Sequence, residues 1–106
     1  MQNSFKLFIL AALAGIAAAQ DSVELCTGAN LGGSCVVAAN TRNKCNNVGA
    51  AQNDQISSIH LGAGTACRFW ADGNCQGNSI IVRTDVADLS TLGFNDVISS
   101  FTCFPA

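Results

Sequence analysis

Apolar and polar residues alternate in short segments along most of the chain, after one long apolar run at its N-terminus. Val23 and Leu25 flank a charged residue, and so do Cys67 and Phe69, which is the period-two pattern of a strand with one buried face. The segments predicted as strands are Val23–Cys26, Cys35–Ala38, Ile56–Leu61, Cys67–Trp70, Ser79–Val82 and Ile98–Phe104. Only Asp88–Leu92 suggests a short helical turn. We therefore expect an all-β fold in which two inner faces pack as a β-sandwich.

The N-terminal apolar run is typical of a signal peptide. It extends from Leu7 to Ala19 without a charge or a proline, follows the basic Lys6, and ends on small residues that fit signal-peptidase cleavage. The run is too short to span a bilayer as a helix, which needs about 20 apolar residues. We therefore expect residues 1–19 to be removed, residues 20–106 to form one secreted domain, and no membrane span to remain.

The cysteine content agrees with an exported chain. All six cysteines lie after residue 19, and an even number in a short exported chain is typical of disulfides. They are Cys26, Cys35, Cys45, Cys67, Cys75 and Cys103. No C-x-x-C pair occurs, and the single histidine, His60, has no second ligand pattern near it, so a zinc site is not expected.

Charge and residue types argue against two function classes. The expected mature chain has four basic and seven acidic residues, and it lacks the clustered Lys and Arg with interleaved aromatics that nucleic-acid binding requires. His60 alternates with apolar neighbours on a predicted strand and has no evident partner base, so we expect no enzyme activity. Asp85 and Asp88 are interpreted as solvated turn carboxylates rather than a catalytic pair.

An internal repeat organises the chain. The motif Asn53-Asp54-Gln55-Ile56-Ser57-Ser58 returns 42 residues later as Asn95-Asp96-Val97-Ile98-Ser99-Ser100. A glycine-containing hairpin precedes each copy, ending at Gly33 in the first and at Gly77 in the second, with an offset of 44. The first repeat therefore has a loop two residues longer, between Ala39 and Gln52.

These motifs resemble the βγ-crystallin Greek key. The family pattern is an aromatic hairpin with a glycine, followed by Asn/Asp-Asn/Asp-x-x-Ser/Thr-Ser. Both serine-ending motifs match it fully, whereas cysteine and leucine replace hairpin aromatics at Cys26, Leu31 and Cys75. The resemblance implies two Greek-key repeats, residues 20–63 and 64–106, in which disulfides replace part of the aromatic packing. It also implies that Ser58 and Ser100 tie the hairpins down rather than bind a ligand.

The resemblance further implies two calcium sites, each shared between the repeats. The third-position carbonyl and the first serine hydroxyl of each motif would bind one ion, and the Asn and Asp side chains would supply further oxygens. The residues so implied are Asn53, Asp54, Gln55, Ser57, Asn95, Asp96, Val97 and Ser99, with the hairpin carbonyls of Thr27 and Ala71. Calcium takes six to eight oxygens of mixed type in flexible geometry, which suits such loops. The alternative is that each Asn-Asp pair only caps a turn.

The same resemblance bears on the disulfides. Six cysteines allow fifteen pairings, and the sequence alone does not select one. In the implied fold, the first and last strands of the second repeat lie side by side, which would join Cys67 to Cys103. Cys26 with Cys35 and Cys45 with Cys75 are then left as the other pairs.

Two functions remain open for such a scaffold. We favour a secreted calcium-binding protein with a structural, extracellular-matrix or stress role, and expect it to be a monomer. The alternative is a killer-toxin-like antimicrobial protein or a protease inhibitor on the same fold. The chain is acidic, unlike most membrane-active toxins. Asn40 to Val48 is the only candidate inhibitory loop.

Overall fold

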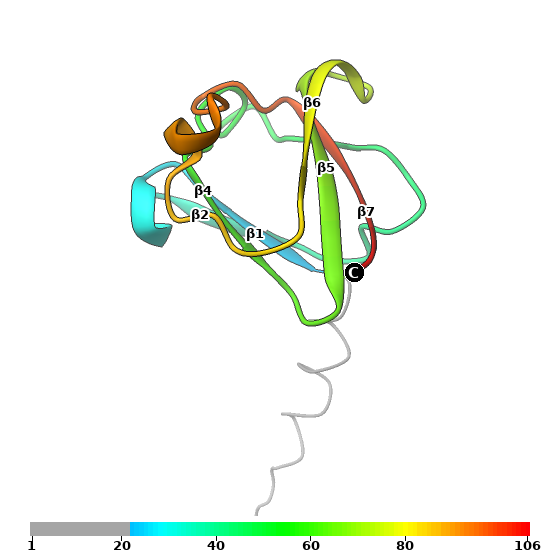
Figure 1. The fold of residues 1–106 in the computed structure, drawn as a ribbon. Helices are drawn as coiled ribbons and strands as arrows, with labels where there is room; N and C mark the ends of the chain where they lie inside the picture. Colours follow the sequence, from blue (N-terminus) through cyan, green and yellow to red (C-terminus); the bar gives the residue numbers. More distant parts are fainter. Residues whose placement is uncertain (1–21) are drawn as a thin grey trace, which may run out of the picture.

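A computed structural model describes residues 22–106, so the predicted signal peptide, residues 1–19, lies outside the described residues. The described chain is all-β apart from two short 3-10 turns (Figure 1). Its elements are β1 Val23–Cys26, η1 Ala29–Leu31, β2 Cys35–Ala38, β3 Asn46–Asn47, β4 Ser58–Leu61, β5 Thr65–Asp72, β6 Gln76–Val82, η2 Leu89–Leu92 and β7 Ser100–Pro105. Within residues 22–106, no helix is long and apolar enough to cross a membrane.

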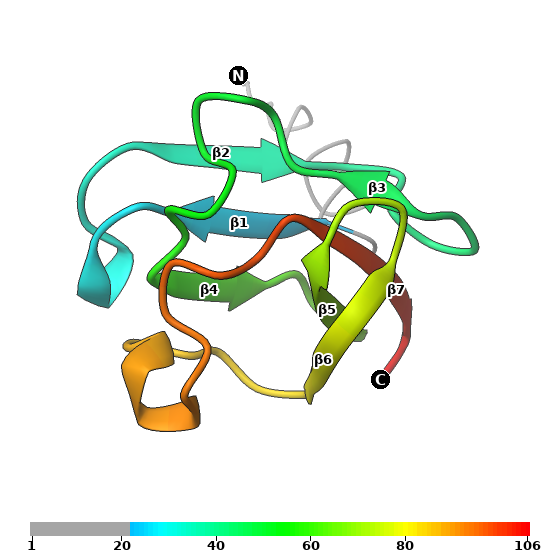
Figure 2. The same cartoon turned by 90° about the horizontal axis from the view of Figure 1, so that it is seen from above.

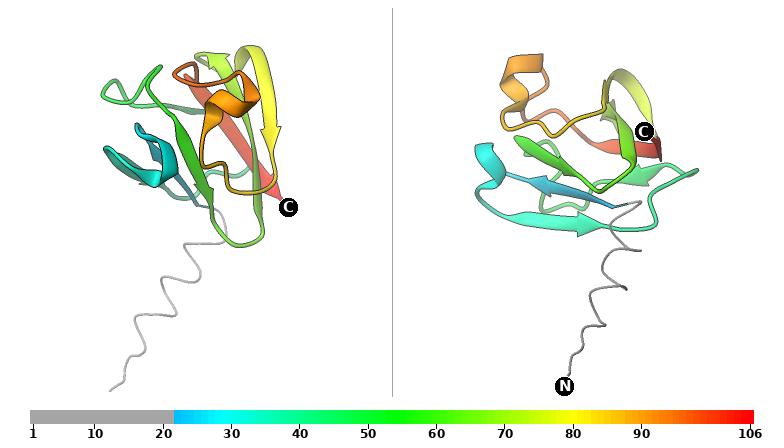
Figure 3. Two further views of the ribbon diagram at one scale, coloured as in Figure 1. Left: turned by 60° about the vertical axis from the view of Figure 1, so that its left-hand side comes forward. Right: turned by 60° about the horizontal axis from the view of Figure 1, so that its bottom comes forward.

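The strands form two antiparallel sheets that face each other. The first, here called sheet one, has the strand order β2-β1-β4. Sheet two has the order β3-β7-β5-β6. Figure 2 and the right-hand view of Figure 3 show the two sheets as separate layers, with β2 and β6 on opposite sides of the molecule. The predicted all-β sandwich is therefore confirmed.

Each half of the chain gives one short segment to the sheet of the other half. In the first half, β3 pairs with β7, with Asn46 opposite Phe101. In the second half, Val86 forms a two-way backbone bridge with Ile59, at 2.9 Å in both directions. These exchanged segments join the two repeats into one unit, because neither sheet is completed by its own half alone.

The core lies between the two sheets and follows the predicted alternation. Val23 and Leu25 from β1 are buried, as are Cys67 and Phe69 from β5. The rings of Phe69 and Phe101 pack with their centroids 5.6 Å apart. Burial of large apolar side chains contributes about 1.5–3 kcal/mol each, so these alternating positions provide much of the drive to form the sandwich.

The predicted strand boundaries need correction at the repeated motifs. β4 begins at Ser58 and β7 at Ser100, so each strand starts two residues later than the sequence predicts. The main chain of Ser57 donates instead to the carbonyl of Cys26, at the rim of the hairpin. The isoleucines before these strands, Ile56 and Ile98, are fully buried although they lie in loops. Because a buried loop residue and a buried strand residue are both apolar, the sequence pattern assigns these isoleucines to the strands.

Three disulfides brace the domain, and the described residues contain no free cysteine. Cys67 and Cys103 face each other in the register of β5 and β7 and are bonded, as predicted. The other two pairs, Cys26–Cys35 and Cys45–Cys75, also form as the remaining pairs. Cys26–Cys35 closes the first hairpin, and Cys45–Cys75 ties the loop before β3 to the second hairpin. The disulfides thus brace the positions where the hairpin aromatics are missing.

The two hairpin glycines adopt backbone angles that other residues avoid. Gly33 has φ +73° and Gly77 has φ +86°. A Cβ on Gly33 would lie 2.8 Å from the main-chain nitrogen of Gly28. Both the torsion angle and the close approach therefore require glycine at this turn.

Candidate metal centre

The two repeated motifs lie against each other and exchange main-chain hydrogen bonds. The amide of Asp54 donates to the carbonyl of Ile98 at 3.1 Å, and the amide of Asp96 donates to the carbonyl of Ile56 at 3.0 Å. The same two positions of the motif are therefore joined in both directions. This reciprocity gives the pair of motifs an approximate two-fold arrangement.

The side chains repeat this exchange. The hydroxyl of Ser99 donates to the Asp54 carboxylate at 3.0 Å, and the hydroxyl of Ser57 donates to the Asp96 carboxylate at 3.3 Å. Each aspartate therefore meets the serine of the other motif rather than its own. The structure thus creates two carboxylate–hydroxyl pairs, each built from both halves of the chain.

Local backbone geometry aims the aspartates across the motif pair. Asp54 and Asp96 both have φ +58°, in the left-handed region that Asp and Asn tolerate better than most residues. This left-handed turn keeps each aspartate out of the strand that follows, and its amide donates to the partner motif instead. The acidic second position of Asn-Asp-x-x-Ser-Ser therefore has a conformational reason as well as a chemical one.

The hairpins cover both carboxylate–hydroxyl pairs in the same manner. The amide of Ser57 donates to Cys26 at 2.8 Å, and the amide of Ser99 donates to Trp70 at 2.9 Å. Thr27 and Ala71, whose carbonyls are predicted ligands, directly follow these acceptors in the chain. Each hairpin carbonyl is therefore held next to the serine with which it would share an ion.

The second serine of each motif holds its hairpin in place. Ser58 Oγ donates to the carbonyl of Gly28 at 2.6 Å and accepts from the amide of Leu31 at 2.9 Å. Ser100 Oγ bonds the second hairpin in the same way, accepting from the amide of Cys75 at 2.8 Å. Both serines are fully buried. Neither hydroxyl faces the carboxylates, so these serines have the structural role that the sequence predicts.

The other predicted ligands lie around the two pairs but make fewer contacts. Asn53 and Gln55 are exposed, whereas Asn95 and Val97 are half-buried. The Val97 side chain packs against the core, so only its main-chain oxygen could bind an ion. Within residues 22–106, no backbone amide outside the regular elements donates to the carbonyl of Gln55 or Val97. Both carbonyls thus keep an acceptor position for a cation.

These oxygens fit calcium in kind and in spacing. Ca²⁺ binds carboxylate, hydroxyl and carbonyl oxygens at 2.3–2.6 Å, so oxygens on adjacent positions of one ion lie roughly 3 to 3.5 Å apart. The carboxylate–hydroxyl separations of 3.0 and 3.3 Å fall in this range. Each hydroxyl now directs its hydrogen at the carboxylate, and rotating it away would leave two oxygens facing one cation.

Comparison with known proteins identifies the fold. No protein-family profile matches the chain, and no curated protein does either. A structure associated with the evolution of the eye-lens βγ-crystallin domain fold superposes with a TM-score of 0.70 at 26% identity, covering 82% of this chain and 88% of that chain. The fold is that of a βγ-crystallin domain. The resemblance seen in the two motifs is thereby confirmed.

Two further structures extend this similarity. A βγ-crystallin from an archaeon has a TM-score of 0.65 at 27% identity, covering 78% of this chain and 96% of its own. The βγ-crystallin domain of Abundant Perithecial Protein from Neurospora crassa, determined in the Ca²⁺-bound form, has a TM-score of 0.66 at 24% identity. That alignment covers 81% of this chain and 90% of the Neurospora domain.

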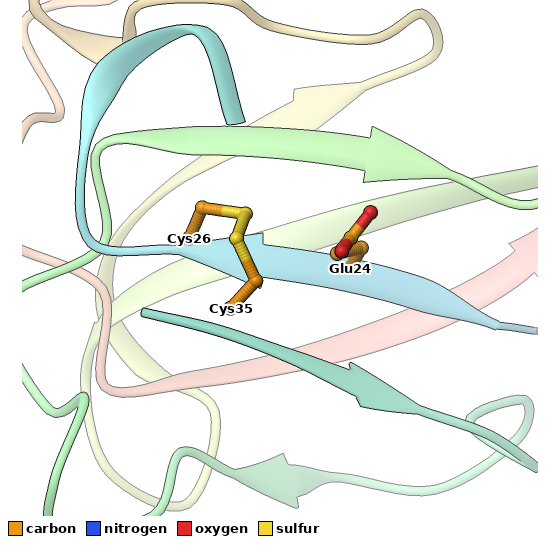
Figure 4. A group of neighbouring side chains, drawn as sticks. All are labelled: Glu24, Cys26 and Cys35. Carbon is orange, nitrogen blue, oxygen red and sulfur yellow. A yellow bond between two sulfur atoms is a disulfide. The ribbon is translucent and has the colours of Figure 1, made fainter. Parts of the chain in front are cut away.

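A second cluster of possible ligands in this βγ-crystallin domain does not form a metal site. Glu24, Cys26 and Cys35 are the only three His, Cys, Asp or Glu side chains whose ligand atoms gather within 4.8 Å among the described residues. Figure 4 shows that the two sulfurs are bonded to each other, with the Glu24 carboxylate beside them on β1. Metal-binding cysteines act as free thiolates. The disulfide therefore leaves Glu24 as a lone carboxylate.

Asp85 and Asp88 lie in the loop before η2, and Asp85 is 55% exposed, as expected for turn carboxylates, but both also make specific hydrogen bonds. Asp85 accepts from the amide of Leu61 at 2.8 Å and contacts His60 at 2.6 Å, so it fastens the exchanged segment around Val86 to β4. Burial opposes ionisation of Asp85, but the bonds from Leu61 and His60 and the His60 charge outweigh it and lower the pKa of this carboxyl. Asp88 caps η2 through Ser90, whose hydroxyl and amide bonds lower the pKa of Asp88.

Proposed function

We propose that this chain is a secreted calcium-binding protein of βγ-crystallin type, with a structural, extracellular-matrix or stress role rather than an enzymatic one. The observation that carries the proposal is the reciprocal pairing of Asp54 with Ser99 and of Asp96 with Ser57. A turn cap needs only its own backbone. Caps alone would not require carboxylates and hydroxyls from opposite repeats to meet at ligand spacing.

Two ions are proposed, one at each carboxylate–hydroxyl pair. The first would bind Ser57, the carbonyls of Gln55 and Thr27, and the Asp96 carboxylate. The second would bind Ser99, the carbonyls of Val97 and Ala71, and the Asp54 carboxylate. One carboxylate per ion favours affinities in the range of about 10⁻⁵ to 10⁻³ M that is typical of sensors and extracellular modules. The similar Neurospora domain was determined in a Ca²⁺-bound form, which supports calcium binding on this fold.

Export supports this function but is itself part of the proposal. The apolar segment Leu7–Ala19 and the three disulfides both favour an oxidising extracellular compartment. Extracellular fluids contain calcium at concentrations that load weak sites. Sequencing the N-terminus of the secreted protein tests the expected cleavage after Ala19.

Calorimetric titration with calcium tests the binding proposal, and three matched variants locate the sites. Asp54→Gly and Asp96→Gly each remove the whole side chain and with it every side-chain oxygen, and glycine tolerates the positive φ of these positions. Each should lower the stoichiometry from two ions to one. Glu24→Gln removes a carboxylate on the outer face of β1 and should still bind two. Equal heats from all four proteins would place any binding elsewhere.

The inhibitor alternative has one observation in its favour. The loop from Asn40 to Val48 is held at several points: Asn46 Nδ2 donates to the carbonyls of Thr41 and Phe101 at 3.0 and 3.2 Å, and Cys45 is bonded to Cys75. A rigid exposed loop is the feature that protease inhibitors use. Inhibition of proteases by the purified protein, with loss on Lys44→Ala, would favour this function; no inhibition would leave calcium binding alone.

A further inference from the structure

The two sheets end in free edge strands that occupy equivalent places in the two repeats. β2 is the edge of sheet one, and β6 is the edge of sheet two. The hairpin offset of 44 residues relates Val37 on β2 to Ile81 on β6. Val37 is 67% exposed and Ile81 is 52% exposed, although both are large apolar residues. The two edges lie on opposite sides of the domain (Figures 2 and 3).

The main chain of Val37 points away from the domain. Antiparallel pairs alternate between hydrogen-bonded and non-hydrogen-bonded, and the latter have Cα atoms about 4.5 Å apart. The Cα atoms of Cys26 and Cys35 are 4.1 Å apart, which marks a non-hydrogen-bonded pair. Glu24 and Val37 lie two pairs further along the same register, so they are of the same type. The N–H and C=O groups of Val37 therefore face the free side of β2.

The same reasoning applies to Ile81 on β6. Cys67 and Cys103, with Cα atoms 4.0 Å apart, form a non-hydrogen-bonded pair between β5 and β7. The main-chain groups of Cys67 therefore point toward β6 and form a hydrogen-bonded pair with Val82. The next pair, Arg68 with Ile81, is non-hydrogen-bonded. The N–H and C=O groups of Ile81 also face outward. The two edges thus offer matching donors and acceptors at equivalent positions.

Charge distinguishes the ways in which two edges could pair. Neither β2 nor β6 contains a charged residue. Glu24 on β1 lies directly opposite Val37, and Arg68 on β5 lies directly opposite Ile81. Arg68 Nε donates to Ser79 at 2.8 Å, which holds its guanidinium beside β6. Joining β2 to β2 would place two Glu24 residues about 14 Å apart, whereas joining β2 to β6 would place Glu24 at about that distance from Arg68, so charge favours the second arrangement modestly and mainly at low ionic strength.

We propose that β2 of one copy of this chain pairs with β6 of a second copy, extending sheet one of the first by sheet two of the second. Because the two edges differ, the contact is head-to-tail. The assembly therefore always keeps one unpaired β2 edge and one unpaired β6 edge at its ends, where further copies can add. Strand addition satisfies the exposed main-chain groups of both edges. The paired edges are short, so each contact is weak and assembly depends on protein concentration, and the monomer expected from the sequence is then the state in dilute solution. This assembly is independent of the calcium sites, which lie on the motif loops.

Sedimentation equilibrium of the disulfide-bonded protein, in chelator and in calcium, tests the proposal. Wild type should form a concentration-dependent series beyond a dimer in both conditions. Val37→Lys blocks the β2 edge and Ile81→Lys blocks the β6 edge, so each variant alone should be monomeric. An equimolar mixture of the two should form a 1:1 dimer and grow no further, because one intact β2 and one intact β6 remain. Leu92→Lys, at an exposed apolar residue outside the strands, should behave like wild type.

Other outcomes overturn the proposal. A monomeric wild type up to its solubility limit excludes the contact. A dimer of Ile81→Lys alone would mean that β2 pairs with β2, and a dimer of Val37→Lys alone would mean that β6 pairs with β6. Hydrogen exchange of the wild type provides a check without variants: the Val37 and Ile81 amides should exchange slowly in concentrated solution and rapidly in dilute solution. Equal rates at both concentrations would also refute the pairing.

Discussion

The Asp54 carboxylate accepts a hydrogen bond from the hydroxyl of Ser99, which lies 45 residues later in the chain. The amide of the same aspartate donates to Ile98, so main chain and side chain of one residue both contact the partner motif. Asp96 makes the equivalent contacts with Ile56 and Ser57. Any ion bound here would therefore hold the two halves of the domain together.

The single tryptophan should report on one site only. The carbonyl of Trp70 accepts from the amide of Ser99, which places this residue beside the Asp54–Ser99 pair. Calcium should therefore change the Trp70 fluorescence of wild type and of Asp96→Gly, whereas Asp54→Gly should show no change. A calcium response that survives Asp54→Gly but disappears in Asp96→Gly would show that the sites are assigned the wrong way round.

Adjacent serines should have separable roles. Ser58→Ala removes the acceptor for the part-buried bond from the amide of Leu31 and the bond to Gly28, and should lower the free energy of unfolding by about 1–3 kcal/mol. Calcium binding should persist in this variant below its melting temperature. Ser57→Ala should instead lose the first site with a smaller loss of stability in chelator. Urea unfolding in chelator and calcium titration measure the two effects; equal losses in both assays would contradict the division.

Gly33→Ala should destabilise the first hairpin. The new Cβ would meet the Gly28 nitrogen at 2.8 Å, and φ +73° is strained for any residue with a side chain. A non-glycine residue held in that region costs about 1–3 kcal/mol. Gly49→Ala is the matched control, since nothing lies within 4 Å of its added Cβ. Thermal unfolding should separate the two variants, and equal melting temperatures would argue against the turn geometry.

Asp85→Asn should reduce stability in a pH-dependent way. Because the folded-state pKa of Asp85 is lowered, its contribution is complete above the unfolded value of about 3.9 and is lost as the pH falls through the folded pKa. The variant should therefore be less stable than wild type near neutral pH and equal to it in strong acid. Asp85 is 55% exposed, so solvent screening limits the difference to about 1 kcal/mol or less. A constant difference at all pH values would exclude the ionised carboxylate as its cause.

The repeated motif made most of the fold predictable, because each of its positions has a local physical role. The alternation at Val23 and Leu25 predicts the inner face of β1, and the strand register predicts the bond between Cys67 and Cys103. The loop isoleucines were assigned to strands because burial and strand pairing give the same apolar pattern. The Ile56 side chain is buried in the core, but its carbonyl accepts from Asp96 of the other motif rather than from a paired strand.

Long-range polar contacts outside the motif left no sequence signal. His60 and Asp85 are 25 residues apart, and neither belongs to a repeated element, so their pairing follows only from the exchange of Val86 into sheet one. For the motifs, the family resemblance implies sites shared between the repeats. Which serine each aspartate contacts follows only from the two-fold arrangement of the motifs.

Scanning calorimetry of the wild-type protein in chelator and in millimolar calcium tests the calcium assignment most directly. A ligand that binds only the native state stabilises it by RT ln(1 + [L]/Kd), about 2.7 kcal/mol per site at 100 times Kd. We predict a higher melting temperature in calcium than in chelator, and little change with magnesium, whose octahedral geometry fits these loops poorly. Superimposable melting curves in chelator and in calcium would contradict the account and leave the two Asn-Asp-x-x-Ser-Ser motifs as turn caps.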